Sequence, residues 1–159
     1  MNILPRGPER RVLISLLVLL FNSHTMQAQQ PLSVRVMPVQ VSPEGESTQS
    51  FTFSVTNQSR KKIRFCTYMT PFEGFYGDYL EIRDAEGAKI PYQGVKVKRG
   101  KPGKEDHIRL GKGETISVNF SLKENYSLNG SGPFQLQFKG SPYLNELPDS
   151  ELVEFEASL

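Results

Sequence analysis

The stretch TISVNFSL, residues 115–122, decides the fold class of this chain. Its apolar residues, Ile116, Val118, Phe120 and Leu122, fall at every second position, and polar residues lie between them. Successive side chains of a β-strand point to opposite faces of the sheet. The pattern therefore indicates a strand with one buried face and one solvated face.

The same period of two recurs along most of the chain. Gly, Pro, Asn and Asp separate the alternating segments as turn residues do, and no segment after residue 28 has the apolar stripe of an amphipathic helix. We therefore predict an all-β fold, an immunoglobulin-like antiparallel β-sandwich of about seven or eight strands. The other strands are expected at residues 32–36, 51–55, 63–67, 80–82, 90–97, 134–138 and 152–157.

Tyr126 lies between two of these expected strands, in the run Tyr126-Ser127-Leu128. In immunoglobulin-like sandwiches a tyrosine in such a place bonds a nearby backbone group and forms a tyrosine corner. We expect either this corner or an ordinary loop tyrosine.

The N-terminus has the pattern of a secretory signal peptide. Three arginines precede an apolar run at residues 12–21, which is half the length of about 20 residues that a membrane-spanning helix needs. We predict a signal peptide at residues 1–28 and a single domain at residues 29–159, in a secreted or periplasmic protein. The alternative is an uncleaved N-terminal anchor.

The predicted mature chain keeps 16 of the 19 basic residues and 16 of the 17 acidic ones, so it is close to neutral. General nucleic-acid binding calls for a basic domain. We therefore expect no nucleic-acid partner, and no membrane contact after signal cleavage.

The residues that catalysis or metal binding would need are missing. The chain has only two histidines, His24 and His107, and neither belongs to an HExxH zinc motif or a Ser-His-Asp set. The single cysteine, Cys66, suits a small buried residue, with a reactive thiol or an intermolecular disulfide as the alternative. Nothing in the local sequence supports a dyad of Cys66 and His107. We predict a protein that is not an enzyme and holds no cofactor and no metal.

Two segments are candidates for contact with a partner. The first is rich in lysine and glycine, which favours an exposed loop for an acidic partner, although such lysines also discourage pairing of strand edges. The second, residues 70–77, has three aromatic residues between turn-forming ones, which form either a binding patch or a plug at one end of the sandwich. The candidate residues are Lys96, Lys98, Arg99, Lys101 and Lys104 in the first segment, and Phe72, Phe75 and Tyr76 in the second.

Several motifs in order support a family resemblance. They are CTYMTPFEG at residues 66–74, PYQGVKVKRGKPG at residues 91–103, GETIS at residues 113–117 and YSL at residues 126–128. With them, the chain resembles the N-terminal non-catalytic β-domain that precedes the zinc protease domain of bacterial deuterolysin-like and peptidyl-Lys metalloendopeptidases.

The resemblance implies a prosegment-like role without the protease. Such a domain is expected to bind a separate extracellular zinc metalloendopeptidase, to inhibit it or to assist its folding. Peptidyl-Lys enzymes accept lysine in an acidic pocket, which Lys98, Lys101 or Lys104 can occupy. The alternative function is a carbohydrate-binding or adhesion module that uses the three aromatic residues.

Overall fold

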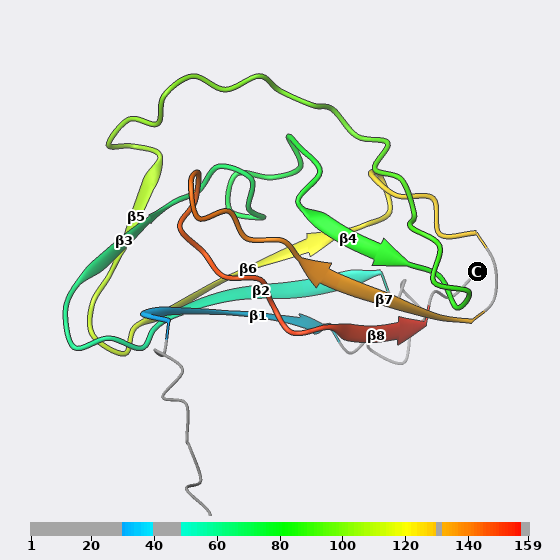
Figure 1. Ribbon diagram of the computed structural model, residues 1–159, viewed down its shortest axis with the longest axis horizontal. Coiled ribbons are helices and arrows are strands. Elements are labelled where there is room, and N and C mark those ends of the chain that lie inside the picture. The colour runs from blue at the N-terminus through cyan, green and yellow to red at the C-terminus, as the bar shows by residue number, and fades with distance from the viewer. Residues whose placement is uncertain (1–29, 40–48, 130–131, 157–159) are drawn as a thin grey trace, which may run out of the picture.

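The computed structural model describes residues 30–39, 49–129 and 132–156, and the predicted signal peptide lies outside them. The described chain is all-β, with eight strands in antiparallel pairs and no helix, as the alternation predicts (Figure 1). The strands are β1 (Leu32–Pro38), β2 (Ser50–Asn57), β3 (Ile63–Cys66), β4 (Leu80–Arg83), β5 (His107–Leu110), β6 (Thr115–Ser121), β7 (Pro133–Phe138) and β8 (Val153–Glu156).

The strands form three small sheets. One sheet has the order β1-β2-β6, the second has the order β4-β7-β8, and β3 with β5 makes a separate ribbon. Figure 1 shows the two three-stranded sheets stacked, with the ribbon at one end. The ribbon continues directly from β2 and leads directly into β6, since only short turns separate these strands.

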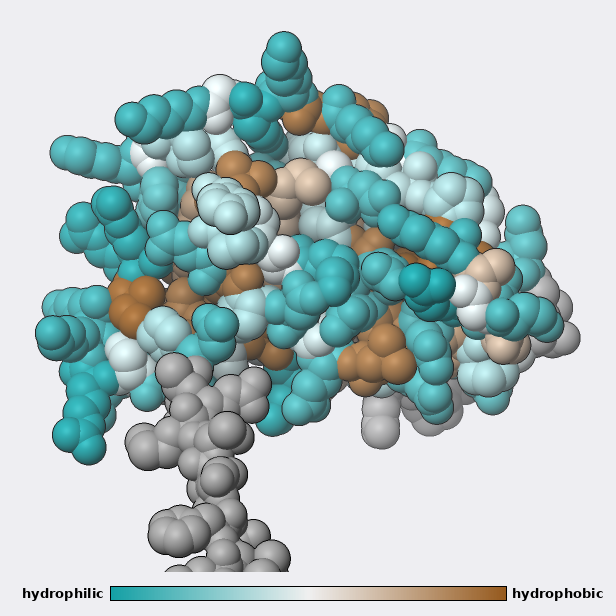
Figure 2. Space-filling model, viewed as in Figure 1, coloured by the Kyte–Doolittle hydropathy of each residue, from teal (hydrophilic) through white to brown (hydrophobic). Residues whose placement is uncertain are grey.

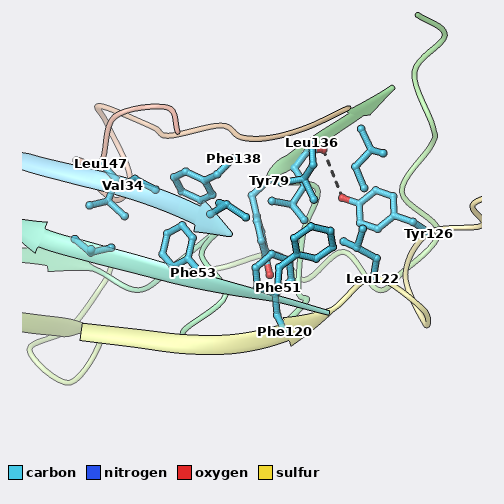
Figure 3. Packing of buried hydrophobic residues seen from close by; sticks show 14 of the residues in the cluster. Val34, Phe51, Phe53, Tyr79, Phe120, Leu122, Tyr126, Leu136, Phe138 and Leu147 are labelled. Carbon is cyan, nitrogen blue, oxygen red and sulfur yellow. Dashed lines mark hydrogen bonds between the residues drawn. The ribbon is translucent and has the colours of Figure 1, made fainter. Parts of the chain in front are cut away.

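Aromatic rings fill the space between the two stacked sheets (Figure 3). Phe53 of β2 meets Phe138 of β7 at 4.8 Å between ring centroids, and Phe51 of β2 meets Phe155 of β8 edge-on at 4.9 Å. β2 has buried residues at every second position, so its alternation is expressed fully. Rings packed in this way gain contact energy beyond the area that they bury.

Only some of the alternating apolar residues of β6 have buried side chains. Phe120 and Leu122 are buried, whereas Ile116 and Val118 are half-buried. The strand expected at residues 90–97 is wrong, because this segment has no strand beyond an isolated bridge at Lys89. Pro91 and Gly94 interrupt it, and it has no partner strand.

Tyr126 is buried in the connection between β6 and β7, and its hydroxyl bonds residues at the start of β4 rather than backbone a few residues upstream of itself. Its hydroxyl donates to Asp78 Oδ1 at 3.3 Å and to the carbonyl oxygen of Leu80 at 3.5 Å, the second of which is dashed in Figure 3. Burial raises the pKa of this phenol, which stays protonated. Tyr126 therefore ties the crossing between the two sheets to β4.

Asn57 joins the stacked sheets to the ribbon. This side chain is fully buried at the end of β2. Its amide nitrogen donates to the carbonyl oxygens of Lys61, Leu110 and Gly111 at 2.7, 3.1 and 2.8 Å. Its amide oxygen accepts from the backbone nitrogen of Ser59 at 2.9 Å. One side chain thus satisfies the backbone of both turns where the chain enters and leaves the ribbon.

We predict that Asn57→Ala lowers the free energy of unfolding by about 2 to 3 kcal/mol, because it leaves buried carbonyl groups without a donor. Chemical denaturation measures the change. Asn119→Ala is the matched control, since Asn119 is exposed and its side chain accepts a hydrogen bond from Thr52, its one side-chain partner among the described residues. The control should stay within about 0.5 kcal/mol of the wild type. Equal effects of the two substitutions would contradict the role given to Asn57.

Candidate partner-binding surface

The lysine-rich segment is part of a long connection that we call the arch, residues 89–106. It runs from the turn after β4 across the top of the molecule to β5 (Figure 1). Without a partner strand, it is held at separate points. The backbone nitrogen of Gln93 donates to the carbonyl of Asn125 at 2.9 Å, and that of Val97 donates to the carbonyl of Tyr76 at 2.9 Å.

Arg99 fastens the arch to the loop of residues 67–77. Its guanidinium lies over the rings of Tyr68 and Tyr76, at 5.1 and 5.0 Å from their centroids. It also pairs with Glu73, with 2.8 Å between Nη2 and Oε2. An arginine stacks on aromatic faces and donates to a carboxylate at the same time, which a lysine cannot do. We call this arrangement the Arg99 clasp.

Glu73 is positioned for this pairing by its own loop. Its second carboxylate oxygen accepts from the backbone nitrogen of Met69 at 2.7 Å, and the side chain is only 10% exposed. The neighbouring turn is closed by Thr70, whose hydroxyl donates to the carbonyl of Thr67 at 2.6 Å. Gly74 follows with a φ of 87°, a conformation that favours glycine. The TPFEG motif is thus a turn that presents Glu73 to the arch.

The three aromatic residues of this loop have different environments. Phe72 packs against Phe53 and Phe65 at 5.6 and 5.8 Å between ring centroids. Phe75 stacks on Tyr79 at 5.3 Å. Both rings therefore plug the core, which is the alternative that the sequence left open. Tyr76 alone of the three belongs to the exposed class, and one face of its ring is covered by Arg99.

The far end of the arch is closed by Asp106. Its Oδ2 accepts from the backbone nitrogen of Gly103 at 2.8 Å and from the hydroxyl of Tyr68 at 2.9 Å. These two hydrogen bonds, the one from Gly103 first, lower the pKa of the Asp106 carboxyl. His107 Nδ1 lies 2.6 Å from the carbonyl oxygen of Gly103. The last turn before β5 is therefore fixed from both sides.

Lys89, at the start of the arch, pairs with Asp78, and the other four lysines are left for solvent or a partner. Lys96, Lys98, Lys101 and Lys104 are exposed, and none of them forms an ion pair within the described residues. Lys96 lies 6.0 Å from the ring centroid of Tyr92. In Figure 2 the upper rim, where the arch runs, consists mainly of hydrophilic side chains. Of the five predicted basic residues, Arg99 therefore holds the arch in place, and the four lysines point outward from it.

Cys66 and His107 lie directly opposite each other in the ribbon. Sequence reasoning gave this pair no support, and its surroundings do not suit a nucleophile. Burial raises the pKa of the Cys66 thiol, and its sulfur accepts from the backbone nitrogen of Tyr68 at 3.5 Å. A nucleophilic cysteine needs a lowered pKa. In the described part of the chain, no three His, Cys, Asp or Glu residues gather closely enough to hold a metal ion.

Comparison with known proteins gives no match to any family model and no match to a curated protein. Within residues 30–39, 49–129 and 132–156, no helix has the length and apolar character needed to span a membrane.

We predict that Arg99→Lys loosens the arch without unfolding the protein. An ammonium group keeps the charge but loses the stacking on Tyr68 and Tyr76. Amide hydrogen exchange at residues 95–101 should rise at least several-fold, while global stability changes by about 1 kcal/mol or less. Lys98→Ala is the control and should leave the exchange near the wild-type rate. Unchanged exchange in Arg99→Lys would show that the arch is held by other contacts.

The lowered pKa of Asp106 predicts a specific dependence on pH. A carboxyl with a lowered folded-state pKa stabilises the fold above its unfolded value of about 3.9. That stabilisation is lost as the pH falls through the folded-state pKa. Wild type should therefore be more stable than Asp106→Asn near neutral pH, and the difference should shrink below about pH 4. Denaturant titration at several pH values measures it, and a constant difference would contradict the assignment.

Proposed function

We propose that this protein is an exported, non-catalytic domain that binds a separate extracellular zinc metalloendopeptidase through its arch. Binding restrains the protease or assists its folding, outside the cell or in the periplasm. The observation that carries the proposal is the arch itself, with four outward lysines on a backbone fastened by Arg99 and Asp106. The resemblance of residues 66–74 and 91–103 to metalloendopeptidase β-domains supplies the class of partner.

We also propose an immunoglobulin-like topology for the stacked sheets. Immunoglobulin domains place strands A, B and E in one sheet and C, F and G in the other. The orders β1-β2-β6 and β4-β7-β8 correspond to A-B-E and C-F-G. Tyr126 then lies at the E–F corner, where such domains carry a tyrosine, although its hydroxyl bonds the start of β4 and not backbone a few residues upstream. The β3–β5 ribbon is an addition to this plan.

A fastened arch suits the binding of a protease. A segment that is already ordered loses less conformational entropy when it binds than a free loop does. Cations at fixed places also speed association with an acidic surface and set the orientation of the complex. A lysine of the arch, Lys98, Lys101 or Lys104, can then enter an acidic specificity pocket. In this proposal the arch acts on the protease by binding it.

The carbohydrate or adhesion alternative has less support. Sugar-binding platforms need exposed flat rings. Phe72 and Phe75 pack into the core, and Tyr76 is the one member of that patch with an exposed side chain.

The proposal is tested by recovery of partners from the secreted fraction of the source organism, with the purified protein as bait. We expect a zinc metalloendopeptidase, and its peptidase activity should change on addition of the protein. Recovery of glycan or cell-wall material in its place would overturn the proposal.

We predict that the triple variant Lys98→Ala, Lys101→Ala, Lys104→Ala weakens binding of this protease at least about tenfold, because it removes three outward charges from the arch. The matched control is Arg60→Ala, Lys61→Ala, Lys62→Ala, which removes the same charge from the exposed β2–β3 turn. Calorimetry or surface plasmon resonance compares the two. If both triple variants bind equally well, the arch is not the contact.

A further inference from the structure

The edge of β1 that faces away from β2 borders a hollow on the surface of the molecule. The hollow has a volume of about 720 Å³ and is lined by β1 on one side and by residues 151–153, which lead into β8, on the other. Among the described residues β1 pairs only with β2; β8 lies close to β1 but forms no ladder with it, so the backbone groups on the second edge of β1 have no partner strand there. A free edge is a template for pairing with another strand.

The register shows which backbone groups face the hollow. The backbone nitrogen of Val39 bonds Ser50, and that of Gln58 bonds Pro31, so the odd-numbered residues of this stretch face β2. The even-numbered residues Leu32, Val34 and Val36 therefore direct their N–H and C=O groups outward. Pro38 is also even-numbered, so its missing N–H takes nothing from the β1–β2 pair.

The hydroxyl groups of β2 on the floor of the hollow are already engaged by neighbouring hydroxyls. They bond hydroxyl groups of β6, with Ser54 and Ser117 at 2.9 Å and Thr56 and Thr115 at 2.8 Å. Two exposed apolar side chains lie at its border, Met37 at 44% and Leu152 at 53%. An extended strand that uses backbone hydrogen bonds and covers apolar side chains fits this site better than a small polar molecule does.

The charges of the hollow complement each other. Arg35 and Glu151 both line it, and neither forms an ion pair within the part of the chain that the structure describes. A two-fold axis brings the same patch of two copies together, so residue i of one copy meets residue j of the other and the reverse. Arg35 of each copy can then meet Glu151 of the other.

We propose that two copies of this chain pair through β1 in an antiparallel, two-fold dimer, which joins two three-stranded sheets into one. With Val34 opposite Val34 of the second copy, the outward N–H groups meet outward carbonyl groups, and Leu32 lies opposite Val36. Arg35 lies opposite Ser33 of the second copy, so no like charges meet across the new pair. Met37 and Leu152 are covered at the same time.

Charge reversal tests this dimer in the purified protein by sedimentation velocity over a range of concentrations. We expect the wild type to dimerise, and Arg35→Glu or Glu151→Arg to weaken the dimer at least about tenfold, because each places like charges at both ends of the interface. An equimolar mixture of the two single variants should form a heterodimer of near wild-type affinity, since both contacts are then of opposite sign. Intramolecular pairing cannot produce this result.

Arg60→Glu and Glu86→Arg reverse exposed charges away from the hollow and serve as controls that should dimerise like the wild type. A wild type that stays monomeric throughout would overturn the proposal. So would single variants that dimerise as well as the controls, or a mixture that remains monomeric.

Discussion

The packing of Phe72 and Phe75 against the rings of the stacked sheets is the contact on which the candidate binding surface depends. These two half-buried side chains anchor a loop that has no strand of its own, and they do so by packing against the core. The loop then presents Glu73 and Tyr76 at fixed places, and Arg99 reaches both. Hydrophobic packing therefore fixes the loop to which Arg99 fastens the arch, while backbone hydrogen bonds and Asp106 hold the arch at other points.

Two features support the binding role that we propose. The arch offers cations on a backbone that is already fastened, and the free edge of β1 offers a place for a second copy. A dimer of this kind carries two arches, so it can engage two sites on a partner, or two partners, with a gain in effective concentration. Cys66 and His107, the residues closest to a catalytic pair, belong to the framework of the ribbon.

The sequence predicted the all-β class well, because alternation at residues such as Phe51, Phe53 and Val55 is converted directly into a buried face. The prediction of a strand failed where an alternating segment has no neighbouring strand to pair with. Val95 and Val97 alternate with lysines, yet they lie in the arch and are exposed, since burial needs a second strand that local sequence does not specify. β5 was missed because it has only four residues, two of them apolar.

The candidate site was predicted in its composition but not in its organisation. The basic residues and the aromatic loop were both found as motifs. The separate role of Arg99 was not, because its partner Glu73 lies 26 residues earlier and only the fold brings them together. The sequence also could not tell which of Phe72, Phe75 and Tyr76 is exposed. A tight loop has no periodic pattern from which the burial of a side chain can be inferred.

The most direct test of the account is amide hydrogen exchange of the protein with and without the metalloendopeptidase that we propose as its partner. The account predicts slower exchange at residues 95–104 of the arch in the complex, with no equal change at the β2–β3 turn. Unchanged exchange of the arch, with slower exchange elsewhere on the surface, would contradict it.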